Sequence, residues 1–185
     1  MKYEIKKVDE AKGVIQITTT DERWYQVGDK FIPSVTWIAS YYPKTIRFMR
    51  WLAEKGWDEA ELIKHQAAEK GSRGHHACED VLKGKEIAFD AKYPDSEGEE
   101  KELTPDEYEG VMWFADWCNE EQPKILAIED NLINEGNNYA GTRDIKCRLK
   151  QDNYKVVWSI DIKTSQEIWP SHEIQVSAYK HADPE

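Results

Sequence analysis

The spacing of hydrophobic residues changes along the chain from a strand pattern to a helix pattern. Three runs near the N-terminus alternate apolar and polar side chains, which predicts short strands at residues 3–8, 13–19 and 23–36. Helical spacing begins near Thr36, and Ile46, Met49 and Leu52 form an apolar stripe on the next predicted helix. The N-terminal part is therefore expected to be a small sheet that leads into helices.

The middle of the chain predicts three more helices, and its end predicts a fourth. Residues 58–71 and 72–84 have helical spacing, and each run closes at a glycine, which is a common C-terminal stop. Residues 104–121 open with Thr-Pro-Asp-Glu, which predicts a capping box with proline in the first turn. A last helix is expected from about Ser171. This order of elements favours an α/β (α+β) fold with a central mixed β-sheet flanked by helices.

The tripeptide Asp-Ile-Lys occurs twice within residues 139–165, in two runs that otherwise look like buried strands. A polar turn with Asp152 and Asn153 as its two-residue loop predicts that the two runs form a hairpin. In that register one face is wholly apolar and holds the pairs Ile145–Ile160, Cys147–Trp158 and Leu149–Val156. A slip by one residue would destroy this match, so the pattern itself supports the register.

The other face of the predicted hairpin places Asp144 directly opposite Asp161. Directly opposed residues have Cβ atoms about 4.5 to 5.5 Å apart, where two carboxylates repel each other. A divalent cation bound by the carboxylate oxygens would offset that repulsion. The alternative is a surface network in which one aspartate pairs with Lys146 or Lys163. Beside a cation, Lys163 could neutralise a phosphate oxygen or help to deprotonate an attacking water, as phosphodiester hydrolysis requires.

Composition limits the class of protein. With 185 residues and 39% hydrophobic content, the chain suits one domain over residues 1–185. It has no apolar run near the roughly 18 residues of a membrane span, and its start has no signal or transit pattern. A cytoplasmic protein that does not enter membranes is therefore expected. The three cysteines form no CxxC pair, which predicts reduced thiols rather than a disulfide framework or an iron–sulfur site.

The net charge of -11 argues at first against a nucleic-acid partner. The excess is local, however, because residues 76–135 hold 18 acidic and 5 basic residues. Its densest part, residues 95–109, is interpreted as a solvated loop that leads into a helix, with an acidic partner-binding segment as the alternative. Lys44, Arg47 and Arg50 line a helix face that is either solvated or follows a phosphate backbone.

Four short motifs follow one another in the order of a known superfamily. They are "GSRGHHACE" at residues 71–79, "GTRD" at 141–144, "DIK" at 161–163 and "QVSAY" at 175–179. This set resembles the PD-(D/E)xK nucleases and, within them, the RecB-like branch. The lead-in "PSVTWI" and the ending "IDIKTS" resemble most closely the mitochondrial genome maintenance exonucleases with their phage and bacterial relatives. The resemblance implies a restriction-endonuclease-like core. Relatives continue beyond the last motif, so a chain truncated at its C-terminus is one interpretation.

The resemblance also implies which residues carry the chemistry. The implied ligands of Mg²⁺ or Mn²⁺ are His75, Asp144, Asp161 and the carbonyl of Ile162. The implied catalytic residues are Asp144, Asp161, Lys163, Gln175 and Tyr179. Gln175 and Tyr179 would support the site or contact the DNA strand. Only the motif spacing selects His75 over His76, which a helix would turn about 100° away. An imidazole ligand favours Mn²⁺ somewhat over Mg²⁺.

These inferences predict a metal-dependent DNA exonuclease that acts on single-stranded DNA or DNA ends in replication, recombination or repair. The expected DNA contacts are Ser34, Thr36, Arg47, Arg50 and Arg73. A structure-specific or restriction-type endonuclease is the alternative on the same fold, because motifs define the chemistry and not the position of the cut. A catalytically inactive nucleic-acid-binding module is the alternative of another class. The sequence leaves the oligomeric state open.

Overall fold

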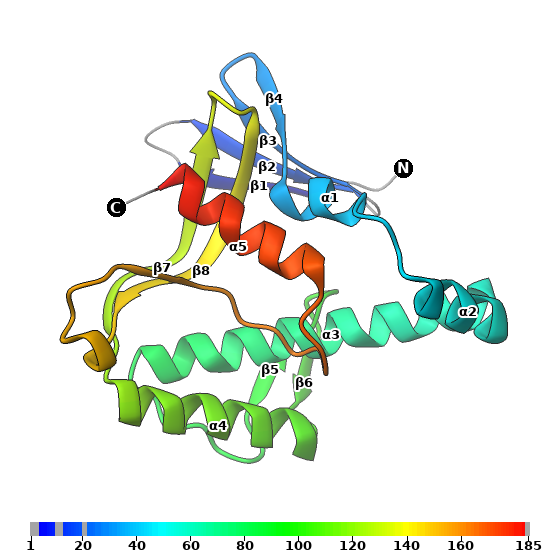
Figure 1. Cartoon of the computed structure of the whole chain (residues 1–185). Coiled ribbons are helices and arrows are strands. Elements are labelled where there is room, and N and C mark those ends of the chain that lie inside the picture. The colour runs from blue at the N-terminus through cyan, green and yellow to red at the C-terminus, as the bar shows by residue number, and fades with distance from the viewer. Residues whose placement is uncertain (1–3, 10–12, 20–21, 184–185) are drawn as a thin grey trace.

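The structure, a computed structural model, describes the chain at residues 4–9, 13–19 and 22–183. Its fold belongs to the α+β class (Figure 1). The N-terminal part is an antiparallel meander of β1 (Glu4–Asp9), β2 (Val14–Thr18), β3 (Arg23–Val27) and β4 (Lys30–Pro33). The third predicted run, residues 23–36, is split at Gly28, whose φ of 60° forms a turn that suits glycine. Buried Tyr25 and Ile32 pack with Ala140 and join this sheet to the rest of the core.

Two further antiparallel sheets contain the remaining strands. The larger has the order β7 (Lys124–Asn134), β8 (Tyr139–Arg148) and β9 (Trp158–Ile160), and the smaller is a hairpin of β5 (Lys92–Pro94) and β6 (Glu100–Glu102). The central mixed β-sheet that the sequence predicted is therefore not found among the described residues. Among the described residues, the only parallel contact is an isolated bridge between Ser34 and Ala140. It extends no further because Ser34 already caps a helix.

The described residues form five α-helices: α1 (Val35–Ser40), α2 (Ile46–Lys55), α3 (Trp57–Leu82), α4 (Pro105–Glu121) and α5 (Pro170–Ala182). α5 lies beside α1 and against the β7–β8 hairpin, whereas α3 and α4 pack against each other at the other end of that hairpin (Figure 1). None of these helices has both the length and the apolar character needed to cross a membrane.

α3 continues through Gly71, where the sequence predicted a stop between two helices. The reason is tertiary packing. The segment after β9 lies against the glycines of α3, and a Cβ added at Gly74 would come within 3.1 Å of Thr164 Cγ2. Close packing therefore outweighs the helix penalty of glycine, which is about 1 kcal/mol. The second predicted stop is close to the observed end, because α3 ends at Leu82 and Gly84 has a φ of 75°.

β8 and β9 pair in the predicted register, through Ile145–Ile160 and Cys147–Trp158. Ile145 and Cys147 are fully buried and pack with aromatic residues of α4. The third expected pair, Leu149 with Val156, lies outside the ladder, and Val156 is 49% exposed. The apolar face of the hairpin thus anchors its strands on α4 but is shorter than the sequence predicted.

The two-residue turn predicted at Asp152 and Asn153 is wrong. A short 3₁₀ helix, Lys150–Asp152, follows β8, and Asn153 then takes a left-handed conformation with a φ of 55°. The carboxylate of Asp152 accepts hydrogen bonds from the backbone N–H of Lys155, at 3.1 Å, and from Trp158 Nε1, at 2.7 Å. These bonds stabilise a longer loop, so the chain returns to the sheet only at Trp158.

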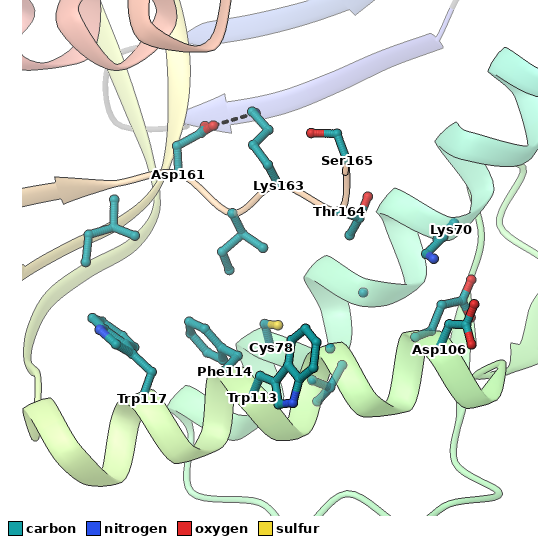
Figure 2. A pocket seen from close by; sticks show the side chains of 16 residues that line it. Lys70, Cys78, Asp106, Trp113, Phe114, Trp117, Asp161, Lys163, Thr164 and Ser165 are labelled. Carbon is teal, nitrogen blue, oxygen red and sulfur yellow. Dashed lines mark ion pairs between the residues drawn. The ribbon is translucent and has the colours of Figure 1, made fainter. Parts of the chain in front are cut away.

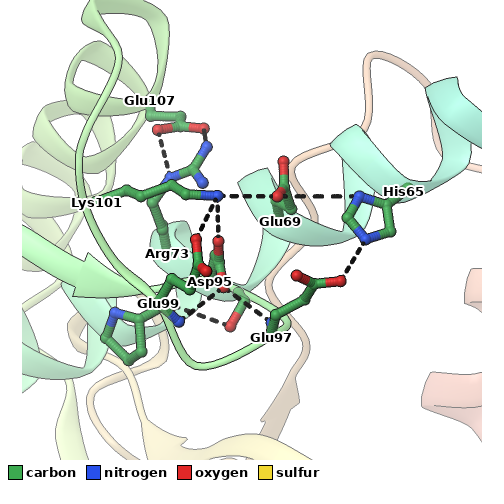
Figure 3. A network of polar contacts seen from close by, with 10 residues as sticks. His65, Glu69, Arg73, Asp95, Glu97, Glu99, Lys101 and Glu107 are labelled. Carbon is green, nitrogen blue, oxygen red and sulfur yellow. Dashed lines mark hydrogen bonds and ion pairs between the residues drawn. The ribbon is translucent and has the colours of Figure 1, made fainter.

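The acidic residues 95–109 lead into a helix, as the sequence predicted, but they are not one solvated loop (Figure 3). They form the turn of the β5–β6 hairpin, β6 itself and the start of α4. Lys101 Nζ lies 2.6 Å from Asp95 Oδ2 and 3.1 Å from Glu69 Oε1 on α3. The hydrogen bond from Lys101, together with two backbone N–H groups, lowers the pKa of Asp95 to about 2. Part of the local charge excess is therefore neutralised within the fold.

Arg73, which was expected to contact DNA, is buried between α3 and α4. Its Nε lies 3.1 Å from Glu107 Oε2 and its Nη2 lies 2.6 Å from Glu107 Oε1, which makes a bidentate pair. Glu107 also accepts the backbone N–H of Thr104 and completes the predicted capping box of α4. Because only 7% of Arg73 is exposed, its guanidinium joins two helices and does not reach a surface that DNA could contact.

Arg73→Ala is expected to lower the free energy of unfolding by about 3 to 5 kcal/mol, because it leaves the buried Glu107 carboxylate without its partner. Urea unfolding followed by tryptophan fluorescence measures this change. The control is Arg50→Ala on the exposed face of α2, which should alter stability by no more than about 0.5 kcal/mol. Weaker DNA binding by Arg73→Ala without any loss of stability would contradict the structural role.

Candidate metal centre

His75 and the carbonyl of Ile162 face each other across α3 and the segment that follows β9. His75 Nε2 lies 3.0 Å from Ile162 O. The neighbouring His76 is exposed, and its nearest acidic contact is Glu79 at 3.9 Å on the same helix. The helical turn between the two histidines therefore directs only His75 to the candidate site, as the motif spacing predicted.

Asp144 on β8 lies beside the same two residues, His75 and Ile162. Its Oδ2 accepts the backbone N–H of Ile162 at 2.6 Å and lies 3.6 Å from His75 Nδ1. The ladder ends at Ile160, so Asp144 and Asp161 are not a paired couple within it. The hydrogen bond to Ile162 nevertheless holds β8 beside the Asp-Ile-Lys segment, which places both carboxylates in one site.

The electrostatics of the site follow from burial. Asp144 is only 8% exposed, and its burial, followed by the negative charge of Asp161, raises its pKa to about 7. The Ile162 N–H and the charge of Lys163 oppose this shift without cancelling it. Burial, followed by the charge of Lys163, lowers the pKa of His75, which favours the neutral imidazole that a metal ion needs. Cation binding would therefore release a proton from Asp144 where that group is still protonated.

Asp161 is held by residues from the other motifs. Its Oδ1 accepts a hydrogen bond from Gln175 Nε2 at 3.0 Å, and the same nitrogen lies 2.8 Å from Tyr179 Oη. Lys163 Nζ forms an ion pair with Asp161 Oδ2, which Figure 2 shows as a dashed line. Gln175 and Tyr179 are both buried, so α5 supports this carboxylate from inside the protein.

A close contact between two motifs explains how α5 reaches the site. A Cβ added at Gly141 of β8 would lie 2.5 Å from Cε1 of Tyr179. The glycine of the G-x-x-D motif therefore leaves room for the tyrosine of the Q-x-x-x-Y motif. This contact lets α5 pack directly on the strand that carries Asp144.

Glu129 on β7 is a candidate ligand that was missed in the sequence. Its carboxylate, His75 and Asp144 offer ligand atoms that all lie within 4.8 Å of one another. Glu129 is an exposed residue with a φ of 51°, and desolvation of its carboxylate, followed by the charge of Asp144, raises its pKa. Asp161 lies outside this group of three, because Gln175 and Lys163 hold its carboxylate. The signal in the sequence was an acidic residue directly after the apolar run of residues 125–128.

The remaining expected residues divide into those that DNA could reach and those that it could not. Ser34 is only 1% exposed, and its Oγ accepts the backbone N–H of Trp37, so it caps α1 and cannot contact DNA as expected. Thr36 is exposed at the start of that six-residue helix. Arg47 and Arg50 are exposed on α2, and Arg47 Nη1 lies 3.3 Å from a carboxylate oxygen of Glu167.

Comparisons of the chain with protein-family models, with curated proteins and with solved structures found no match. The donor set of the site itself suits a divalent cation. It combines one imidazole with carboxylate oxygens and a backbone carbonyl, which are ligands that Mn²⁺ and, apart from the imidazole, Mg²⁺ prefer. Among these ligands, the buried carboxylate of Asp144 is the one whose negative charge a bound cation would stabilise most.

Proposed function

We propose that the chain is a metal-dependent nuclease that hydrolyses phosphodiester bonds of DNA. The observation that carries this proposal is the convergence of three segments on one site: His75 from α3, Asp144 from β8 and the Asp-Ile-Lys segment after β9. Metal-assisted hydrolysis of a phosphodiester needs residues that hold a cation, and a neighbouring lysine can take part in proton transfer. The four motifs that resemble those of the PD-(D/E)xK nucleases support the same activity.

Each residue of the site has a role in this proposal. His75, Asp144 and the carbonyl of Ile162 would hold Mg²⁺ or Mn²⁺, with Glu129 within reach as a further ligand. When bound, the cation supplies positive charge at the phosphate and lowers the pKa of water. The ammonium of Lys163 orients the attacking water or neutralises a phosphate oxygen.

Asp161 is the second carboxylate of the proposed site. Gln175 fixes the orientation of Asp161 by donating a hydrogen bond to Oδ1, and Tyr179 in turn lies within hydrogen-bond distance of Gln175. Their burial keeps water away from this side of the carboxylate. Gln175 and Tyr179 therefore act through Asp161, as positioning residues.

Single-stranded DNA or a DNA end is the proposed substrate, and an exonuclease is the proposed class. Arg47 and Arg50 are exposed on α2, and the contact of Arg47 with Glu167 brings this basic face next to the segment between Lys163 and α5. A strand that follows α2 would therefore be led towards the proposed centre. The acidic residues 95–109 do not oppose this path, because their charges are partly paired within the β5–β6 hairpin and with α3.

Cleavage assays with three substrates test the proposal. End-labelled linear single-stranded DNA, closed circular single-stranded DNA and linear duplex are each incubated with Mg²⁺, Mn²⁺ or EDTA. We expect loss of the linear single strand with either metal, intact circles, and no reaction in EDTA. Cutting of the circle would assign an endonuclease instead. Absence of cleavage of every substrate with both metals would refute the catalytic proposal.

A further inference from the structure

A cavity of about 440 Å³ lies between α3, α4 and residues 160–165, beside the proposed metal centre (Figure 2). One wall consists of the rings of Trp113, Phe114 and Trp117, which point from α4 towards that segment. Phe114 and Trp117 stack with ring centroids 5.5 Å apart and belong to the core under the hairpin. Trp113 differs because it is 68% exposed. Its indole therefore remains available to a ligand.

The same cavity is polar where it meets the proposed centre. Asp161 and Lys163 line it and form their ion pair there. Lys70 on α3 adds an ammonium, and Thr164 and Ser165 add two hydroxyls (Figure 2). Within the described part of the chain, Lys70 has no ion-pair partner. The aromatic wall of the cavity thus lies opposite the hydrogen-bonding groups of residues 161–165.

Two further carboxylates, those of Asp106 and Glu107 on α4, line this cavity. Glu107 is neutralised by its bidentate pair with Arg73. Asp106 lies in the exposed first turn of α4, where an acidic side chain interacts favourably with the helix dipole. The cavity therefore has a cation, Lys70, on its α3 side and an anion, Asp106, on its α4 side.

A second cavity, of about 340 Å³, is bounded by the same segment, α3 and the first turn of α5. It shares Lys70 and Lys163 with the first cavity, and it adds His75 and His172. Among the described residues, no carboxylate lines it. An aromatic cavity and a cationic cavity therefore share the wall that carries the proposed catalytic lysine.

We propose that the aromatic cavity binds an unpaired nucleobase of the strand that is cut, with a neighbouring phosphate in the cationic cavity. The identity of this ligand rests on the proposed nuclease function. A nucleobase offers a flat face to the indole of Trp113 and polar edge atoms to Thr164 and Ser165. A base must leave its stack in the DNA to enter the cavity, which a single strand or a frayed end allows more readily than an intact duplex. The cavity is of a size that holds one small ligand.

The test measures binding without cleavage, by fluorescence anisotropy of a labelled single-stranded oligonucleotide in EDTA. Trp113→Ala is expected to weaken binding by about 5- to 150-fold, because stacking on an aromatic side chain contributes that much per base. Gly110→Leu should also weaken binding by filling the cavity. Gly110 lines the cavity, and a Cβ at this position would meet nothing within 4 Å, so the fold should tolerate the change. Thermal unfolding checks that both variants fold.

The matched control is Phe31→Ala, which removes another exposed aromatic side chain from β4, in the N-terminal sheet, and should change binding less than 2-fold. A second control replaces the bases of the oligonucleotide by abasic deoxyribose. This replacement should weaken binding by the wild type but make little difference to Trp113→Ala. Unchanged binding by either cavity variant, or an equal loss with and without bases, overturns the base-binding proposal.

The two proposals can fail separately. Metal-dependent cleavage by the wild type, combined with unaltered binding by Trp113→Ala, would retain the nuclease and refute the base site. Base-dependent binding through Trp113 without cleavage in Mg²⁺ or Mn²⁺ would retain the base site and refute the catalytic function.

Discussion

Lys163→Ala is expected to lower the rate of metal-dependent DNA cleavage by about 10²- to 10⁴-fold. The reason is the position of the ammonium, which forms an ion pair with Asp161 and lines both cavities beside the proposed centre. Without it, no other lysine in the described residues lies on the Asp-Ile-Lys segment to orient water or neutralise a phosphate oxygen. Single-turnover cleavage of end-labelled single-stranded DNA with saturating Mn²⁺ measures the effect on the chemical step.

The matched control is Lys146→Ala, the lysine of the other Asp-Ile-Lys tripeptide. Lys146 Nζ lies 2.7 Å from Asp183, which also accepts a hydrogen bond from Arg143. This lysine therefore ties β8 to the end of α5, and its removal should leave most of the cleavage rate. An equal loss of rate in both variants would show that the two tripeptides have been assigned wrongly. A circular dichroism spectrum of each variant excludes unfolding as the cause.

Local patterns in the sequence predicted much of this arrangement, because they depend on neighbours along the chain. The capping box at Thr104 and the pairing of Ile145 with Ile160 are of this kind, since each is set by short-range spacing. The failures depend on distant partners. Gly71 was expected to end a helix, but close packing with the segment that follows β9 lets α3 continue. No pattern within α3 alone contains that information.

The same distinction applies to the candidate site. The resemblance to the nuclease motifs implied that His75 and Asp144 share a site, and the structure places His75 Nδ1 3.6 Å from Asp144 Oδ2. Arg73 carries a charge of the kind that binds phosphate, yet its partner Glu107 lies 34 positions away and buries it. Glu129 was missed because only the β7–β8 pairing brings it beside Asp144. Charge identifies a residue as a candidate, but tertiary contacts decide its role.

Asp144→Asn is expected to stabilise the metal-free protein at pH 8. The pKa of Asp144 rises from 3.8 to about 7 on folding, so the folded state binds the proton more tightly than the unfolded chain. The contribution of this group to stability therefore falls as the pH rises from about 4 to about 7, and it stays at its lowest value above that range. The shift corresponds to at most about 4 kcal/mol, which the neutral asparagine would recover.

Urea unfolding in EDTA at pH 5 and pH 8 measures this effect, and Asp183→Asn is a control of opposite sign. The hydrogen bond from Lys146 lowers the pKa of Asp183, so its charge stabilises the fold at pH 8 and its loss should destabilise it. If Asp144→Asn destabilised the metal-free protein at pH 8 as Asp183→Asn does, the carboxylate would already be compensated by protein groups. A cation would then have no uncompensated charge to neutralise.

Mn²⁺ should narrow the difference in stability between the wild type and Asp144→Asn. At a concentration of 100 times its dissociation constant, a ligand that binds only the folded state stabilises it by about 2.7 kcal/mol. The wild type should gain this stability. At one fixed concentration of Mn²⁺, its gain in the free energy of unfolding should be larger at pH 8 than at pH 6, because ionised Asp144 is the form that binds the ion. Asp144→Asn should gain little and should not cleave DNA. A carboxylate that binds a metal destabilises the metal-free fold and increases the affinity for the ion. A carboxylate with a purely structural role does neither. Equal stabilisation of both proteins by Mn²⁺ would remove Asp144 from the proposed centre.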